Sequence, residues 1–234
     1  CSFTVSPYIV VDDFESYKNS SPYKINQKWI DGQGFEADTF FPQGNQGNGT
    51  GSTVGNIMNS TIFHNGRQCI PISYNNTGTL NISEVTRTYE VVQDWTACNV
   101  KTLVLYFCGQ PANTGQLYVR VNSKKITYDA DSSAIARSSW TQWNIDLAPI
   151  AASRGGLKIK TLTIGIEGGN SGTLYVDDIR LFRDAPIASD KVIQLDKEFG
   201  DHQVVQRTIG RTQGQINISG TINHNDVNRV EAQV

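Results

Sequence analysis

The stretch LYVDDIRLF, residues 174–182, combines the β-branched, aromatic and aliphatic residues of a β-strand with two adjacent carboxylates, Asp177 and Asp178, at its centre. A strand that packs against a core favours apolar neighbours, so this charge needs a partner or a function. Near the other end of the chain, IVVDDFESY at 9–17 has the same form. The two stretches therefore predict strands that carry carboxylates at both ends of one domain.

The composition predicts an all-β protein. Of the 234 residues, 38% are hydrophobic and only 18% are charged, and 21 are Gly among many Asn, Ser and Thr. These residue types are poor helix formers and are common in the turns that join short strands. The net charge of −2 offers no basic surface for nucleic acid, and no apolar run reaches the roughly 18 residues of a membrane helix. We therefore expect neither a nucleic-acid partner nor a membrane span.

Alternation of apolar and polar residues marks eight candidate strands. They are 8–16, 67–74, 83–91, 101–108, 116–122, 140–147, 158–166 and 173–183. In four of them the alternation also separates an inward from an outward face. The residues predicted to face inward are Leu103, Leu105, Phe107, Leu117, Val119, Val121, Trp143, Ile145, Leu147, Ile159, Leu162, Ile164 and Ile166, with a shift of register near Thr161. A core built this way predicts a two-sheet sandwich.

The strands divide the chain into a large domain and a tail. A Gly/Asn-rich loop at 44–60 interrupts the first half, and APIASD at 185–190 has the composition of a linker. We expect a jelly-roll domain at 1–184, a linker at 185–191, and a β-strand extension or the start of a further domain at 192–234. The predicted fold is thus all-β, a two-sheet jelly-roll sandwich with a C-terminal β extension.

The sequence carries no recognisable catalytic motif. The three histidines, His64, His202 and His224, have no metal-ligand spacing, and the glycine run at 47–55 lacks the ending of a phosphate loop. A glycosidase needs two carboxylates about 5–10 Å apart across a cleft, which adjacent strand residues do not supply because they point to opposite faces. We therefore expect a protein that is not an enzyme.

The acidic strands suggest a metal site. The first and last strands of a jelly roll commonly lie close together, which would bring the acids of 9–17 near Asp177 or Asp178. Carboxylates gathered in a partly buried place repel one another, so they either take up protons or bind a cation. Calcium, with six to eight oxygen ligands, suits such a place. Alternatively, the acids lie at strand ends, in water or paired with lysines, Arg87 or Arg180.

Five motifs occur in an order that a known family also has. They are VDDFESY at 11–17, WIDG at 29–32, SEVTRTYEVVQDWT at 83–96, WTQWNIDL at 140–147 and LYVDDIRLF at 174–182. Over residues 8–183 the chain therefore resembles the β-jelly-roll carbohydrate-binding modules that have an Asp-Phe-Glu opening strand and an Asp-Asp-Ile closing strand. Similar sandwiches occur in large surface or secreted bacterial proteins.

This resemblance implies a ligand, a metal and a cellular setting. It implies a structural calcium ion held by Glu15 and Asp178, with Asp13 and Asp177 as further contributors. It also implies a non-catalytic module of an extracellular bacterial protein, secreted or at the cell surface, that binds a polysaccharide or glycan. The kind of sugar does not follow, because the binding face varies in such modules while the scaffold stays.

The outward residues of three strands supply the candidate ligand site. They are Tyr106, Tyr118, Arg120, Trp140, Gln142 and Asn144, which all have the outward parity. A saccharide presents apolar C–H patches and a rim of hydroxyls, which aromatic rings, planar amides and a guanidinium match. The alternative is the ordinary outer face of a sandwich. Trp29 and Trp95 are predicted to plug the sandwich ends rather than to bind ligand.

Two further features allow two interpretations each. Cys98 and Cys108 flank a strand, so they either form a disulfide or remain free thiols. The tail from Gly200 to Gly220 weakly resembles the β-sandwich region of sialate-acetylesterase-type enzymes. Alternatively, its strands add to a neighbouring subunit, which would make the chain a homo-oligomeric building block of a surface filament or sheath.

Overall fold

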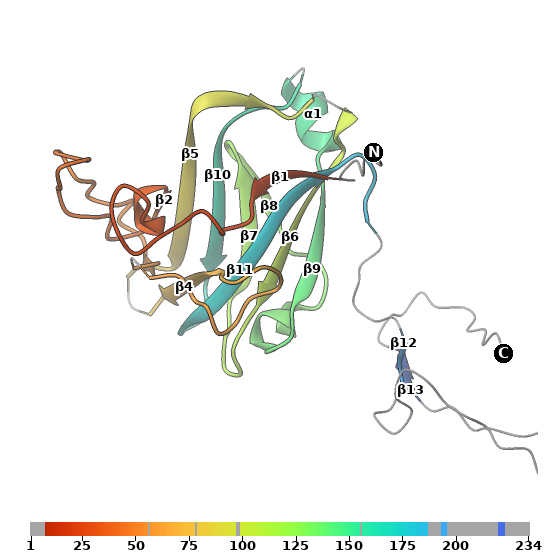
Figure 1. Ribbon diagram of the computed structural model, residues 1–234. Helices are drawn as coiled ribbons and strands as arrows, with labels where there is room; N and C mark the ends of the chain where they lie inside the picture. The colour runs from red at the N-terminus through yellow and green to blue at the C-terminus, as the bar shows by residue number, and fades with distance from the viewer. Residues whose placement is uncertain are drawn as a thin grey trace, which may run out of the picture. The chain divides into compact units, whose positions relative to one another are not determined.

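The computed structural model describes residues 8–55, 57–77, 79–96, 99–154 and 156–186, together with the backbone of 193–195 and 220–222. It divides the chain into two compact units, Cys1–Ile187 and Ala188–Val234. In the described part of the first unit, antiparallel strands are the main regular elements, and long loops join some of them (Figure 1). None of the helices in the described part of the chain is long and apolar enough to cross a membrane.

One sheet of the first unit has the order β3-β4-β11-β6-β9. Its strands are β3 (Ser52–Thr53), β4 (Ile70–Asn75), β11 (Ser171–Phe182), β6 (Thr102–Cys108) and β9 (Thr141–Asp146). The opening strand β1 (Tyr8–Asp12) joins this sheet by pairing with β11, and Figure 1 shows the two strands side by side. The first and last strands of the domain therefore meet, as the sequence predicted.

The other sheet has the order β2-β5-β10-β7-β8. Its strands are β2 (Trp29–Ile30), β5 (Ile82–Asp94), β10 (Lys158–Glu167), β7 (Gln116–Val121) and β8 (Lys124–Thr127). From β4 to β11 the chain crosses between the sheets at every step except from β7 to β8, which pair with each other. This alternation confirms the predicted jelly roll. Short helices, α1 (Ala148–Arg154), η1 (Ile25–Gln27) and η3 (Ser132–Ala136), lie in the connections.

The hydrophobic core lies between the two sheets, where the alternation places it. All thirteen residues predicted to face inward belong to one buried cluster. The predicted shift of register is a break in the β10–β5 pairing between Ile159 and Thr161. Trp29 and Trp95 are also buried in this cluster, so neither presents its ring to solvent.

A β-bulge in β11 corrects one expectation about its acids. The pairing of β11 with β6 shifts between Asp177 and Arg180, and Asp178 has a left-handed backbone with φ +50°. A bulge inserts an extra residue, so the strict alternation of faces is lost at that point. As a result Asp177 and Asp178 both reach the same segment, at His64, instead of pointing to opposite faces.

The strands that the sequence did not predict are short. β2 and β3 have two residues each and β8 has four, so none carries enough alternating positions to be recognised. In the second unit the described strands β12 (Ile193–Leu195) and β13 (Gly220–Ile222) pair antiparallel with each other. Most of the predicted linker and tail, and Cys98 of the possible disulfide, lie outside the described residues. Cys108 is a buried free thiol, as is Cys69.

Candidate functional site

The six residues predicted to bind a ligand do not share one face, which corrects the sequence interpretation. Tyr106, Gln142 and Asn144 belong to β6 and β9 and Trp140 directly precedes β9, so these four lie on the β11-containing sheet. The remaining two residues, Tyr118 and Arg120, belong to β7 of the other sheet. Alternation tells inside from outside, but it does not tell which of two sheets an outward residue belongs to.

On the β11-containing sheet, three of these four residues form a chain of hydrogen bonds. Tyr106 Oη donates to Gln142 Oε1 at 2.8 Å, and Gln142 Nε2 donates to Asn144 Oδ1 at 2.8 Å. The ring of His64 stacks on Tyr106 with 3.7 Å between the centroids, and it meets Trp140 edge to face. Because His64 covers the Tyr106 ring, that ring is not a platform for a sugar.

The segment 63–68, which contains His64, is held by the predicted metal ligands. The backbone N–H groups of His64 and Asn65 donate to Asp177 Oδ2, at 2.9 and 3.3 Å. The backbone N–H groups of Arg67 and Gln68 donate to Glu15 Oε1, at 2.8 and 3.1 Å. The carboxylates of the opening and closing strands thus reach one loop from two sides and accept its N–H groups.

Asp178, the other closing-strand acid, pairs with Arg180 and forms a hydrogen bond with His64. Its Oδ1 lies 2.5 Å from Arg180 Nη2 and its Oδ2 lies 2.6 Å from His64 Nδ1. The pairing with Arg180 is the alternative that the sequence left open for these acids. The pKa of Asp177 is raised to about 6, because burial and the neighbouring charge of Asp178 raise it by more than the backbone N–H groups of His64 and Asn65 lower it.

The acids predicted to hold calcium have hydrogen-bond or ion-pair partners within the protein. Glu15, Asp177 and Asp178 already accept hydrogen bonds or ion pairs, and Asp13 Oδ1 accepts the backbone N–H of Glu15 at 3.2 Å. Within the described ranges, no three acidic, histidine or cysteine side chains gather closely enough to hold a metal ion. Calcium at these acids therefore stays a prediction of the resemblance.

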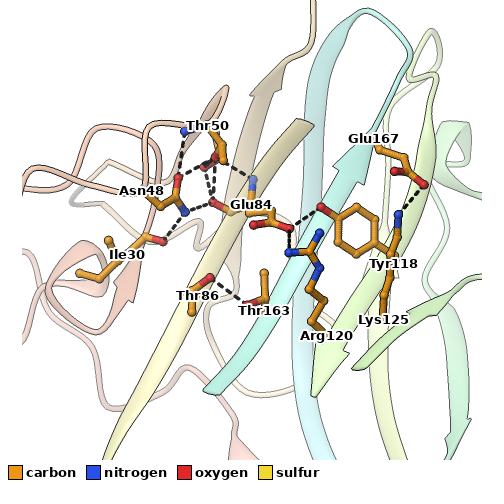
Figure 2. A network of polar contacts seen from close by, with 11 residues as sticks. Ile30, Asn48, Thr50, Glu84, Thr86, Tyr118, Arg120, Lys125, Thr163 and Glu167 are labelled. Carbon is orange, nitrogen blue, oxygen red and sulfur yellow. Dashed lines mark hydrogen bonds and ion pairs between the residues drawn. The ribbon is translucent and has the colours of Figure 1, made fainter. Parts of the chain in front are cut away.

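The outer face of the other sheet carries a connected set of charged and hydroxyl groups (Figure 2). Glu84 on β5 accepts a hydrogen bond from Tyr118 Oη at 2.5 Å and an ion pair from Arg120 Nη1 at 3.1 Å, both through Oε1. Lys125 Nζ pairs with Glu167 Oε1 at 2.5 Å. This face is therefore polar and its charges are paired.

Tyr118 is fully buried although its side chain lies on that outer face. Its ring lies against Gly165 of β10, where an added Cβ would come within 2.4 Å of Tyr118 Cζ. Lys125 Nζ lies 4.1 Å from the ring centroid and covers the ring from outside. Tyr118 therefore offers no exposed ring to a ligand, and only Arg120 of the predicted pair reaches solvent.

A pocket of about 510 Å³ lies along the edge of β5. β2 pairs with β5 only at Trp29–Arg87 and Ile30–Thr86. The part of β5 that follows Arg87 therefore extends past Trp29, the first residue of β2. The loop before β2 supplies the other residues that line the pocket, from Ser16 to Lys28. We call this the tyrosine pocket and define it by Tyr17, Pro22, Tyr23, Lys28, Tyr89 and Glu90.

Asp12 of the opening strand holds two of the side chains that line the tyrosine pocket. Its Oδ2 accepts from Tyr17 Oη at 2.7 Å, from Trp29 Nε1 at 2.8 Å and from Arg87 Nη1 at 2.5 Å. Because the Tyr17 hydroxyl is bonded to this buried carboxylate, Tyr17 presents its ring rather than its hydroxyl to the pocket. The acid in the opening strand thus positions the site, and the Asp12–Arg87 pair is again the ion-pair alternative from the sequence.

Tyr89 differs from Tyr17 because its hydroxyl has no hydrogen-bond partner. Its side chain is only 8% exposed, and its Oη atom is buried and unpaired. Burial raises the pKa of Tyr89 to about 12, so the hydroxyl is protonated at neutral pH and can donate. An unpaired buried hydroxyl lowers the stability of the fold by an amount on the order of 1–3 kcal/mol.

Sequence reasoning missed this pocket. Tyr89 has the parity of the buried Val85, so alternation assigns it to the core, while Tyr17 and Tyr23 lie in a segment without alternation. The available signal was the density of tyrosines that flank two predicted strands. Without the course of the loop from 16 to 28, that density did not indicate a common pocket.

No family model matches this sequence, and no curated protein matches it. Among solved structures, the family 11 carbohydrate-binding module of a cellulosomal cellulase of Clostridium thermocellum is 15% identical, with a TM-score of 0.46 over 79% of this chain and 99% of that one. A family 30 module of another cellulosomal cellulase of Clostridium thermocellum is 13% identical, with a TM-score of 0.43 over 68% and 94% of the two chains.

An agarase, AgWH50C, is 10% identical to this chain, with a TM-score of 0.48 over 77% of this chain. The match covers only 25% of the agarase. The chain likewise spans 24% of an exo-β-agarase and 24% of a β-1,2-glucanase from Parabacteroides distasonis. Carbohydrate-binding modules are thus among the structures that resemble this chain, in agreement with the resemblance stated from its motifs.

Proposed function

We propose that the chain is a non-catalytic carbohydrate-binding module and that its ligand enters the tyrosine pocket. The observation that carries this proposal is the pocket that Tyr17, Tyr23 and Tyr89 line together, in which Tyr89 has a buried hydroxyl without a hydrogen-bond partner. A buried polar group without a partner is rare in a folded protein, and a ligand hydroxyl would supply the missing acceptor.

The walls of the pocket match the surface of a sugar ring. Tyrosine rings and Pro22 supply apolar faces for C–H groups, while the rim carries the ion pair of Lys28 and Glu90, 3.6 Å apart. Binding sites commonly combine such apolar walls with a few polar groups that fix orientation, in pockets of roughly 300–1,000 Å³. The volume of about 510 Å³ is within this range.

Binding without hydrolysis is favoured by the acids of the pocket. Of the described residues that line it, only Glu90 has a carboxylate, and that side chain is highly exposed. Glycoside hydrolysis uses a pair of carboxylic groups that flank the bond, with the acid of the pair kept protonated by its surroundings. The pocket supplies no second carboxylate, so we propose recognition of the glycan and not its cleavage.

The finer parts of the function are proposals that rest on the sequence resemblance. We propose a bacterial, secreted or cell-surface setting, as in the proteins that the motifs resemble. A structural calcium ion at Glu15 and Asp178 would tie the opening strand to the closing strand, in addition to the loop that both carboxylates hold. Assembly into a filament has no support, because the described C-terminal strands β12 and β13 pair with each other.

Affinity gel electrophoresis tests the proposed function. Soluble β-1,4-glucan, agarose and β-1,2-glucan serve as probes, and Tyr23→Ala removes a ring that is 52% exposed and therefore contributes little to folding. We expect at least one polysaccharide to retard the wild type and the control Trp140→Ala, but not Tyr23→Ala. Retardation of Tyr23→Ala with loss of retardation in Trp140→Ala would move the site to the other sheet and overturn the proposal.

A further inference from the structure

A second hollow of about 220 Å³ adjoins the tyrosine pocket. We call it the β1 hollow and define it by Ile9, Val10, Val11, Asp94, Trp95 and Leu181. Arg87, Tyr89 and Gln93 line both the β1 hollow and the tyrosine pocket, so the two spaces adjoin at these three side chains. A ligand that occupied both spaces would have these side chains as its common floor.

This floor also joins the two sheets of the sandwich. Arg87 projects from β5, and its Nη1 donates to the backbone carbonyl of Val11 in β1 at 3.1 Å as well as to Asp12. The guanidinium therefore spans the distance from one sheet edge to the other beneath the groove. Its guanidinium carbon lies over the Tyr89 ring, 5.0 Å from the ring centroid, so the two side chains contact each other.

Exposed apolar side chains follow the groove along its length. Four of the nine large hydrophobic side chains that are exposed in the described residues line these two spaces: Ile9, Val10, Tyr23 and Val91. Apolar surface gathered along a hollow commonly marks a binding site. A ligand that fills only the tyrosine pocket would leave Ile9 and Val10 in water, whereas a longer one would cover them.

The charged groups that line the groove are balanced. Lys28 pairs with Glu90, Arg87 pairs with Asp12, and Asp94 pairs with Lys158 at 2.5 Å. Each lining charge therefore has a partner of opposite sign, and the groove holds no unpaired charge for a uronate or a sulfate. An uncharged ligand with hydroxyl groups is the class that this lining recognises.

We propose that the tyrosine pocket and the β1 hollow form one groove that takes an extended, uncharged oligosaccharide. One sugar ring lies in the tyrosine pocket, and the following rings pass over Arg87 and Tyr89 to Val10. The inference rests on the proposed function and deepens it, because it assigns a second stretch of surface and a class of ligand. It distinguishes the groove from a pocket for a single terminal sugar.

The first test compares affinity with chain length by isothermal titration calorimetry. The probes are cello-, agaro- or sophoro-oligosaccharides, according to which polysaccharide retards the wild type. We expect the affinity of the wild type to rise at least fivefold from the disaccharide to the longest member. An affinity that does not change with length, or tighter binding of an acidic probe such as oligogalacturonate, would overturn the groove.

A matched pair of variants then locates the added contacts. Val10 and Val92 are the same residue type and equally exposed, at 49%, but Val92 lines neither space. Val10→Asp is expected to lose the length-dependent gain and to keep its affinity for the disaccharide, while Val92→Asp behaves as wild type. If Val10→Asp and Val92→Asp bind the oligosaccharides equally, the groove is refuted but the proposed function stands. If Tyr23→Ala binds the disaccharide as tightly as the wild type, the proposed function itself is refuted.

Discussion

Tyr89→Phe should raise the stability of the protein and lower its affinity for glycan. The substitution removes only the hydroxyl, which is buried and has no partner in the ligand-free protein. Because such a group costs about 1–3 kcal/mol, its removal should raise the free energy of unfolding by about 1 kcal/mol. In a domain of this size that change corresponds to a melting temperature higher by roughly 2–4 °C.

The same substitution should weaken binding, because the ligand loses the donor that it would satisfy. A neutral hydrogen bond contributes about 1 kcal/mol, which corresponds to an affinity about fivefold lower. The prediction is specific because the melting temperature should rise while the affinity for glycan falls. A substitution that merely disturbed the pocket would lower both the melting temperature and the affinity.

Tyr17→Phe is the matched control for this experiment, because it removes the same group from a neighbouring tyrosine whose hydroxyl is bonded. Tyr17 Oη donates to the buried Asp12 carboxylate at 2.7 Å. Loss of a hydrogen bond to a charged group should lower the free energy of unfolding by about 2 kcal/mol. Differential scanning calorimetry measures both variants. If Tyr89→Phe melts below the wild type, as Tyr17→Phe should, then the Tyr89 hydroxyl has a partner and the argument for the pocket fails.

Three further predictions concern the scaffold. Gly165→Ala should lower the free energy of unfolding by about 1–3 kcal/mol in urea denaturation, because its Cβ would collide with the Tyr118 ring; unchanged stability would contradict that packing. Because burial raises the pKa of Asp177 to about 6, the folded protein binds the proton of this carboxyl group more tightly than the unfolded chain does. The free energy of unfolding should therefore fall as the pH rises from about 4 to 6, by at most about 1.4 kcal/mol per pH unit. Asp177→Asn should flatten that slope, and an equal slope would show that another group titrates. The calcium proposal predicts that EDTA lowers the melting temperature of the wild type but not of Glu15→Gln; indifference of the wild type to EDTA would leave these carboxylates held by N–H groups alone.

The sandwich could be predicted because alternation follows directly from the pleat of a strand. Leu103, Leu105 and Phe107 had to share a face, and the break near Thr161 could be seen as two inward residues out of phase. The meeting of the first and last strands also followed from the predicted jelly roll. The alternation in the sequence predicts whether each side chain of a strand points inward or outward.

The site depended on information that alternation does not contain. Tyr106 and Tyr118 both point outward, but from different sheets, because the order of strands decides which outer face a residue joins. The direction of the Asp178 side chain is set by a β-bulge, which interrupts the alternation of inward and outward residues within β11. Tyr23 lies in the loop before β2, and the path of this loop along β5 depends on where β2 begins. No periodic pattern in the sequence predicts that this loop lies beside β5.

The central claim is that glycan lies against the rings of the tyrosine pocket. Intermolecular nuclear Overhauser effects between an unlabelled oligosaccharide and protein with labelled aromatic rings measure this contact directly. The account predicts transfer from sugar ring protons to Tyr17 and Tyr23, with none to Trp140. Transfer to Trp140 and none to the pocket tyrosines would contradict it.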